Sequence, residues 1–137
     1  MDIEEDRLVT WYAGEVFTVD TFPQDSAYVL SVAVGKTRLF IDGAKHGNIS
    51  KYINHSCDPN CTVVILFHNG VLIPAIISNK PIPAGSFLSI SYGDDYDQAF
   101  LPVCLCGSQK CFYKERNKTN ANAMITSPVC GYISVAL

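Results

Sequence analysis

Three cysteines lie within eight residues in the segment Cys104-Leu-Cys106-Gly-Ser-Gln-Lys-Cys111, and no other feature restricts the fold of this chain as strongly. Thiolates are soft ligands that suit tetrahedral Zn²⁺, and the small Gly107 and Ser108 allow the loop to turn back around an ion. The segment therefore predicts a zinc site rather than a set of ordinary buried or loose thiols. Such a site contributes on the order of 10 kcal/mol to the folding of the segment that it closes.

Three ligands leave a fourth position around the ion, and we expect a distant residue to fill it. On residue type alone, Cys57, Cys61, Cys130 and the histidines are all candidates. A structural zinc site is closed by four protein ligands, whereas an open fourth position is typical of a catalytic zinc. The residue types leave both alternatives open.

The length of 137 residues fits one domain, and the 48% of hydrophobic residues is enough to build a core. The longest apolar stretch, Val71–Ile77, is far shorter than the roughly 20 residues of a membrane helix. The acidic segment Met1–Asp6 does not resemble a signal peptide, which argues against a disulfide framework for the six cysteines. We therefore expect a soluble, intracellular, single-domain protein. Its net charge of −3 argues against direct binding of nucleic acid and fits a cationic partner.

Strand patterns dominate the chain, and helix signals are few. One or two helical turns are expected over Gly47–Asn54, and Val129–Leu137 is an apolar tail without a clear partner. The sequence His68-Asn69-Gly70 predicts a tight hairpin turn, because Asn-Gly supplies positive φ angles. Pro74 indicates that the second arm of this hairpin is an edge strand or a bulged strand. Strands are predicted over Leu8–Phe17, Tyr28–Val34, Arg38–Ile41, Thr62–Phe67, Val71–Ser78 and Phe87–Tyr92.

The segment Asn54-His-Ser-Cys-Asp-Pro-Asn60 places polar and nucleophilic residues between apolar strands. Part of it is readily explained, because Asp58-Pro59-Asn60 is a turn sequence. A nucleophilic pair of His55 and Cys57 is disfavoured, since side chains so close in sequence rarely face one another. The residues alone do not assign a function to this segment.

Four blocks in the same order resemble the SET-domain protein lysine methyltransferases, and the resemblance runs from about Leu8 to Phe112. NHSCDPN (54–60) is similar to the Asn-His-Ser-Cys motif of that family, and Ile90-Ser-Tyr92-Gly93 to its Tyr-Gly motif. The cysteine segment 104–111 resembles the post-SET segment, and Tyr12-Ala-Gly-Glu15 resembles a Tyr-x-Gly-Glu strand.

The resemblance implies a β-clip fold of small curved antiparallel sheets, with a C-terminal pseudoknot and a zinc-clipped post-SET loop. It also implies that Cys57 is the fourth ligand of a structural zinc ion, beside Cys104, Cys106 and Cys111. The implied division is a SET domain over residues 1–100, a post-SET zinc segment over 101–116 and a C-terminal tail over 117–137.

The implied activity is transfer of a methyl group from S-adenosylmethionine to a lysine. Tyr92 matches the catalytic tyrosine of the family, and Tyr12 matches a second tyrosine of the lysine channel. The residues that match cofactor-contacting positions are Lys51, Tyr52, Asn54, His55 and Phe112, with Tyr113 as an alternative to Phe112.

The family normally carries a Gly-x-Gly loop before the Tyr-x-Gly-Glu strand, and this sequence contains no Gly-x-Gly. We therefore expect the N-terminal part of the SET domain to be missing, which leaves three hypotheses. The chain is an active methyltransferase, a truncated and weak or inactive SET protein that acts as a binding or regulatory module, or a zinc-stabilised interaction domain unrelated to methylation.

The partner implied by the resemblance is a lysine-containing protein, with histone tails as the first candidate and no membrane involved. The acidic residues Asp94, Asp95 and Asp97 would suit a basic peptide, although they equally fit a solvated loop. The histone hypothesis implies a location in the nucleus at chromatin, with the cytoplasm left open.

Overall fold

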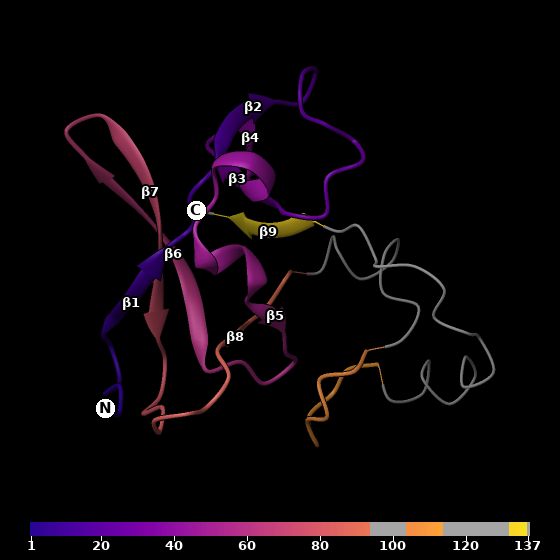
Figure 1. Ribbon diagram of the computed structural model, residues 1–137. Helices are drawn as coiled ribbons and strands as arrows, with labels where there is room; N and C mark the ends of the chain where they lie inside the picture. The colour runs from indigo at the N-terminus through magenta and orange to yellow at the C-terminus, as the bar shows by residue number, and fades with distance from the viewer. Residues whose placement is uncertain (94–103, 114–131, 137) are drawn as a thin grey trace.

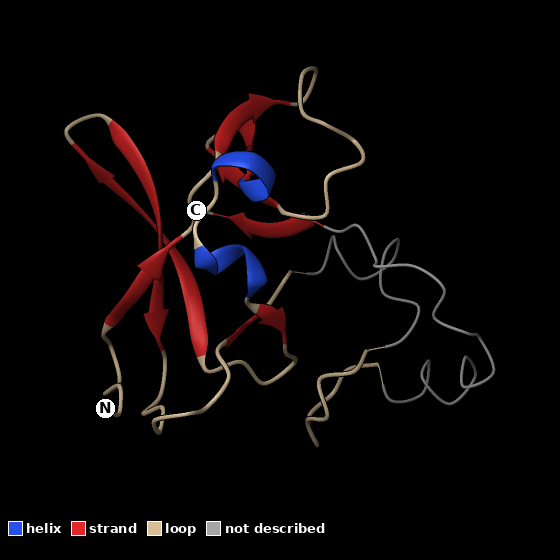
Figure 2. Cartoon of the chain, viewed as in Figure 1, coloured by secondary structure: helices blue, strands red, loops and turns tan. Residues whose placement is uncertain are grey.

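The computed structural model describes residues 1–93, 104–113 and 132–136. Short strands form three small sheets, and the described helices are two single turns of four residues each (Figures 1 and 2). The prediction of a mostly β fold built from small sheets is confirmed. In the part of the chain that is described, no helix is long and apolar enough to cross a membrane.

The first sheet is antiparallel and carries the predicted hairpin. Its strands in spatial order are β1 (Leu8–Trp11), β7 (Val71–Ser78) and β6 (Cys61–His68). Asn69 and Gly70 have φ angles of 49° and 77° between β6 and β7. These positive angles match the twist of the two strands, so the hairpin prediction is confirmed.

Pro74 lies in the central strand of this sheet rather than at its edge. The last pair between β1 and β7 is Trp11↔Ala75, so the proline lies just beyond the end of β1. Its carbonyl still accepts a hydrogen bond from the Tyr12 amide at 2.8 Å. The register between β1 and β7 also shifts between Leu8 and Thr10. Pro74 predicted either an edge strand or a bulged strand, and the central position of β7 excludes the edge strand. The irregularity lies in the register between β1 and β7.

The second sheet has the order β2 (Glu15–Thr18), β4 (Thr37–Asp42), β3 (Val29–Val34) and β9 (Tyr132–Ala136). The first three strands are antiparallel, whereas β9 runs parallel to β3. The apolar tail thus has a partner that its sequence did not reveal. Figure 1 shows β9 beside β3, although some 100 residues separate the two strands along the chain.

The strand predicted over Leu8–Phe17 is divided into β1 and β2, and the chain passes from one sheet to the other at residues 12–14. Gly14 allows this passage, because a Cβ atom there would lie 2.3 Å from the backbone oxygen of Asp42. Real Cβ atoms do not approach backbone so closely, so only glycine fits without a shift of the chain. Tyr12 is consequently held at the junction of the two sheets.

The third sheet is a pair of two-residue parallel strands, β5 (Asn54–His55) and β8 (Ser89–Ile90). The strand predicted over Phe87–Tyr92 therefore extends over only two residues. Before β5 lie the helical turns α1 (Gly43–His46) and η1 (Ile49–Tyr52), the second of which confirms the predicted turn. The C-terminal pseudoknot stays a prediction, because residues 94–103 are not described.

One hydrophobic core joins the three sheets. Its members come from β3, β4, β6, β7 and β8, from the junction residue Tyr12, and from Ile53 and Ile82 in the connections between strands. The buried members are Tyr12, Leu30, Val32, Ile41, Ile53, Cys61, Val63, Ile65, Ile76, Ile82 and Ile90. Tyr92 packs against this core while remaining half-buried.

Candidate functional site

Four cysteines from two distant segments converge at one point. The Sγ atoms of Cys57, Cys104, Cys106 and Cys111 all lie within 4.8 Å of one another. Cys57 Sγ is 3.8 Å from that of Cys104 and 3.9 Å from that of Cys111. Zinc–sulfur bonds of about 2.3 Å in a tetrahedron place the sulfurs about 3.8 Å apart, so the four residues fit a closed zinc site.

These four cysteines are the ligands that the family resemblance implied. Two other cysteines named as candidates for the fourth ligand are not part of this cluster as described. Cys61 is fully buried in the main core, within β6. Cys130 lies outside the described residues, as do Asp94, Asp95, Asp97 and the polar segment Lys114–Asn122. A closed set of four thiols is typical of a structural zinc site rather than a catalytic one.

Cys57, Cys104 and Cys106 have shifted pKa values before any metal is considered. Burial raises the pKa of Cys57 to about 11, and burial likewise raises the pKa of Cys104. For Cys106 burial acts in the same direction, but hydrogen bonds from the backbone of Cys57 and Ser108 outweigh it and lower its pKa to about 7. A bound Zn²⁺ would deprotonate its thiol ligands, so metal binding would release protons from this cluster.

His55 connects the cysteine cluster to Tyr92. Its Nε2 lies 3.4 Å from Cys57 Sγ, and its Nδ1 accepts a hydrogen bond from the Tyr92 amide at 3.2 Å. Because a backbone amide can only donate, Nδ1 carries no proton, and in the neutral ring the proton is on Nε2, facing the sulfur. Burial lowers the pKa of His55, which favours this neutral form. The imidazole thus orients the loop of Cys57 and the backbone of Tyr92 together.

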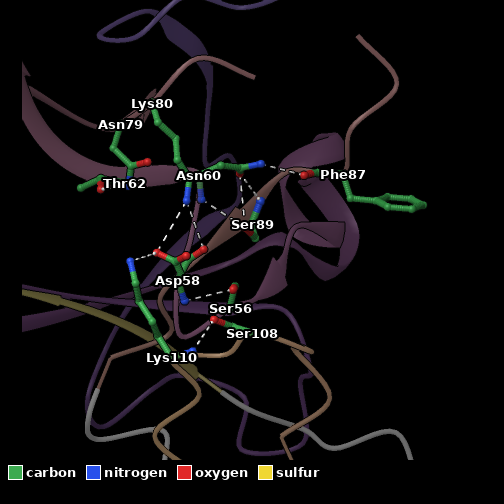
Figure 3. A network of polar contacts seen from close by, with 10 residues as sticks. All are labelled: Ser56, Asp58, Asn60, Thr62, Asn79, Lys80, Phe87, Ser89, Ser108 and Lys110. Atoms are coloured by element: carbon green, nitrogen blue, oxygen red, sulfur yellow. Dashed lines mark hydrogen bonds and ion pairs between the residues drawn. The ribbon is translucent and has the colours of Figure 1, made fainter. Parts of the chain in front are cut away.

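Polar contacts hold the Asn-His-Ser-Cys segment against both the main body and the cysteine loop (Figure 3). The Asp58 carboxylate lies 3.6 Å from Lys80 Nζ and 3.5 Å from Lys110 Nζ. Lys80 follows β7, whereas Lys110 belongs to the cysteine loop. One carboxylate therefore bridges the two parts of the molecule beside the four thiols.

The Asn60 side chain performs a similar task on the other side of the turn (Figure 3). Its Oδ1 accepts a hydrogen bond from the Ser89 amide at 2.8 Å, and its Nδ2 donates to the Phe87 carbonyl at 2.9 Å. Ser89 is the first residue of β8, which leads to Tyr92. Asn60 thus fixes the start of the strand that carries the tyrosine.

Two tyrosines, Tyr12 and Tyr92, lie close enough to interact electrostatically. The Tyr92 hydroxyl donates to the Ile53 carbonyl at 2.7 Å, and the Tyr12 hydroxyl donates to the Tyr28 carbonyl at 2.8 Å. Tyr12 is 2% exposed, and burial raises its pKa, with Tyr92 the next contributor. Both predicted catalytic tyrosines are therefore brought into one site.

Tyr28 belongs to this site, although its sequence pattern predicts only the first residue of a strand. Its ring packs edge-to-face on Tyr52 at 5.9 Å, and the Lys51 ammonium lies 5.4 Å from the Tyr28 ring and 5.3 Å from the Tyr52 ring. Lys51 also donates to the carbonyls of Gly43 and Ala44, both at 3.2 Å. The only sequence signal for a role of Tyr28 in the site is its position as an aromatic residue directly before a buried strand.

The residues predicted to contact a cofactor differ in exposure. Tyr52 is 62% exposed and Phe112 is 81% exposed, and the Asn54 side chain is also exposed. Tyr113 is instead buried against Cys57 and Cys104, with its ring 6.4 Å from that of His55. Exposed amides and aromatic faces are the groups that can bind an amino-acid group and a planar base, and S-adenosylmethionine carries both.

These observations define a small β protein in which a cluster of four cysteines that could hold a metal ion contacts His55, and His55 in turn contacts the backbone of Tyr92. A family model described as "SET domain" matches residues 1–93, which is most of the chain. The chain therefore belongs to the SET-domain family.

Curated relatives extend this similarity beyond residue 93. The chain is 32% identical over 123 residues to the probable histone-lysine N-methyltransferase set-23 of Caenorhabditis briggsae, a match that covers 80% of this chain and 51% of that protein. It is 33% identical over 119 residues to the histone-lysine N-methyltransferase trithorax of Drosophila virilis, covering 80% of this chain and 3% of that protein. It is also 30% identical over 120 residues to an H3 lysine-36 specific histone-lysine N-methyltransferase of Chaetomium globosum. That match covers 80% of this chain and 13% of that protein. The chain thus spans about half the length of the first relative and much less of the other two.

Proposed function

We propose that this chain is an S-adenosylmethionine-dependent protein-lysine N-methyltransferase with a structural zinc ion. The observation that carries the proposal is the His55 ring, which contacts the cysteine cluster with one nitrogen and the Tyr92 backbone with the other. In this proposal the metal centre positions the phenol of Tyr92 through His55. Such an arrangement fits a reaction in which the main task of the protein is to orient the reactants. The names of the relatives support the same reaction class.

Methyl transfer to an amine is an in-line displacement that needs a neutral amine, a short approach and the exclusion of water. Bound S-adenosylmethionine supplies an activated methyl group on its sulfonium. The tasks left to the protein are to bind, to orient the amine and to exclude water. The zinc ion has a structural role in this proposal, because four thiols leave it no open position.

Tyr92 is proposed to position the substrate nitrogen. Its hydroxyl proton is donated to the Ile53 carbonyl, so the phenol oxygen keeps lone pairs that can accept an N–H of the lysine amine. Tyr12 and Tyr28 supply aromatic faces nearby, which suit a methylated ammonium. The raised pKa of Tyr12 keeps that residue neutral at physiological pH.

The cofactor is proposed to lie along Lys51, Tyr52, Asn54 and His55, with Phe112 as a cover. The exposed Asn54 amide would bind its amino-acid group, and the His55 backbone its adenine. Lys51 is expected to act mainly by holding α1 and the two tyrosine rings, because its ammonium already contacts both.

The proposed substrate is a lysine in a basic protein segment, with histone tails first and the nucleus as the location. A net charge of −3 favours encounter with a cationic peptide. The proposed division remains a SET domain over residues 1–100, a post-SET segment over 101–116 and a tail over 117–137, of which residues 132–136 complete the second sheet.

Calorimetric titration of S-adenosylmethionine into the zinc-loaded, folded chain tests the proposal, followed by a histone methylation assay. We expect saturable one-to-one binding and methyl transfer that Tyr92→Phe reduces. The sequence has no Gly-x-Gly, so binding would show that the cofactor site does not require that loop. Absence of binding to folded protein would contradict autonomous catalysis and favour a binding or regulatory module.

A further inference from the structure

The strand β9 resembles in sequence the strand with which it pairs, with three identical residues in register. Residues 132–136 read YISVA, and residues 29–33 of β3 read VLSVA. The parallel register places Ser31 opposite Ser134, Val32 opposite Val135 and Ala33 opposite Ala136. In-register parallel pairing of like residues is typical of strands that associate with their own copies.

The edge that β9 covers is strongly apolar. Without β9, β3 would be the edge strand of the second sheet, because β4 occupies its other side. Val29, Leu30 and Val32 are no more than 1% exposed in the folded chain. An uncovered apolar strand presents free backbone amides and carbonyls and is a ready site for strand addition. The β3 edge is thus a docking site whose preferred ligand is an extended segment of the β9 type.

The connection that precedes β9 is long enough for this strand to reach β3 of a second copy. Residues 114–131 separate Tyr113 from Tyr132, and eighteen extended residues can span about 60 Å. A β9 strand supplied by a second chain would find the same register and the same backbone partners. Exchange of an identical strand between two copies preserves the backbone pairing of that strand with β3. It is a low-cost route to a dimer.

We propose that the β3 edge is a strand-docking site whose partner is a second copy of this chain, so that the β9 strand of each copy pairs with β3 of the other. The closed monomer and the exchanged dimer share the β3–β9 contacts. Their balance is set by the protein concentration against the effective concentration of the tethered strand, which is about millimolar. Exchange therefore becomes prominent toward millimolar protein.

Two proline variants of the full, zinc-loaded chain provide a matched test. Consecutive amides of an edge strand alternate between the neighbouring strand and solvent, so only one of Ser134→Pro and Val135→Pro removes a hydrogen bond to β3. Light scattering from micromolar to millimolar protein should show a growing dimer for the unmodified chain and for one variant, and a monomer for the other. A monomeric unmodified chain at millimolar concentration, or a dimer that both variants retain, would overturn the proposal.

A labelled peptide, Tyr-Ile-Ser-Val-Ala-Leu, tests the docking site without any change to the fold. We expect it to bind the full chain in a fluorescence anisotropy assay and to reduce the dimer of the unmodified chain at high peptide concentration. Affinity for the disruptive proline variant should be roughly tenfold higher or more, because the tethered strand no longer competes. Equal binding of a peptide with the same residues in scrambled order, or no binding to either protein, contradicts a sequence-matched β3 edge.

Discussion

The backbone amide of Tyr92 donates a hydrogen bond to Nδ1 of His55, and the two rings meet edge-to-face at a centroid distance of 5.4 Å. This pair joins β5 to the segment that follows β8, two strands more than thirty residues apart in the sequence. The other nitrogen of the same imidazole faces Cys57. One side chain therefore contacts both the cysteine cluster and the proposed catalytic tyrosine.

Tyr92→Phe should lower methyl transfer by about two orders of magnitude while the chain stays folded, since the ring keeps its packing on His55 and only the hydroxyl is lost. The measurement is methyl incorporation into histone under saturating S-adenosylmethionine. Thr62→Val is a control that removes a hydroxyl from an exposed position on β6, and it should leave the rate unchanged. Equal rates for Tyr92→Phe and the unmodified chain would remove Tyr92 from the proposed mechanism.

Cys57→Ser should abolish stoichiometric zinc binding, because Cys57 is the proposed ligand that joins the cysteine loop to the main body of the protein. Elemental analysis of purified protein should give one zinc per unmodified chain. Cys61→Ala changes a thiol outside the cluster and should retain one zinc, although it leaves a small cavity in the core. A Cys57→Ser protein that keeps a full equivalent of zinc would contradict the four-thiol site.

Stability should fall as the pH rises above about 10, with Tyr12 as one cause. Burial raises the pKa of Tyr12 in the folded chain above the ordinary value of 10.0. The unfolded chain then loses this proton first, so the contribution is complete below pH 10 and declines above it, by up to about 1.4 kcal/mol per pH unit. Denaturant unfolding at several alkaline pH values should show a shallower decline for Tyr12→Phe. An equally steep decline in both proteins would assign the effect to other groups.

Asn60→Ala should destabilise the fold by about 1–3 kcal/mol, because the Ser89 amide and the Phe87 carbonyl both lose their side-chain partner. Asn79→Ala is the matched control. Its Nδ2 makes one exposed contact, with Thr62 Oγ1 at 3.3 Å, and its loss should change stability by less than about 0.5 kcal/mol. Urea unfolding of the two variants provides the comparison. Similar losses of unfolding free energy in both variants would show that the Asn60 hydrogen bonds contribute no more stability than the exposed contact of Asn79.

The strongest sequence signals were those with a local physical cause. The Asn69-Gly70 turn requires positive φ angles, and the cysteine spacing requires a loop around an ion, so both could be recognised in isolation. The convergence of Cys57 on that loop followed only from the family resemblance, because 47 residues separate Cys57 from Cys104. Family descent was thus needed to connect features that local patterns identified separately.

The features that sequence reasoning missed depend on tertiary pairing. Tyr28 reads as the first residue of an apolar strand, and its role follows from the rings and the ammonium that surround it in the fold. The partner of the apolar tail was also missed, since parallel pairing leaves no turn signal between the two strands. Pro74 predicted an edge strand or a bulged strand, and its local chemistry does not reveal that β1 ends just before it and leaves it in a central strand.

The carboxylate of Asp58, shared between Lys80 and Lys110, has a consequence for the kinetics of metal uptake. It draws the cysteine loop toward Cys57 before any ion is captured, so a zinc ion held by the loop finds its last ligand already near. Dissolved salt weakens this attraction between exposed groups. The rate at which the apoprotein acquires zinc should therefore decrease with ionic strength, while the final occupancy stays the same.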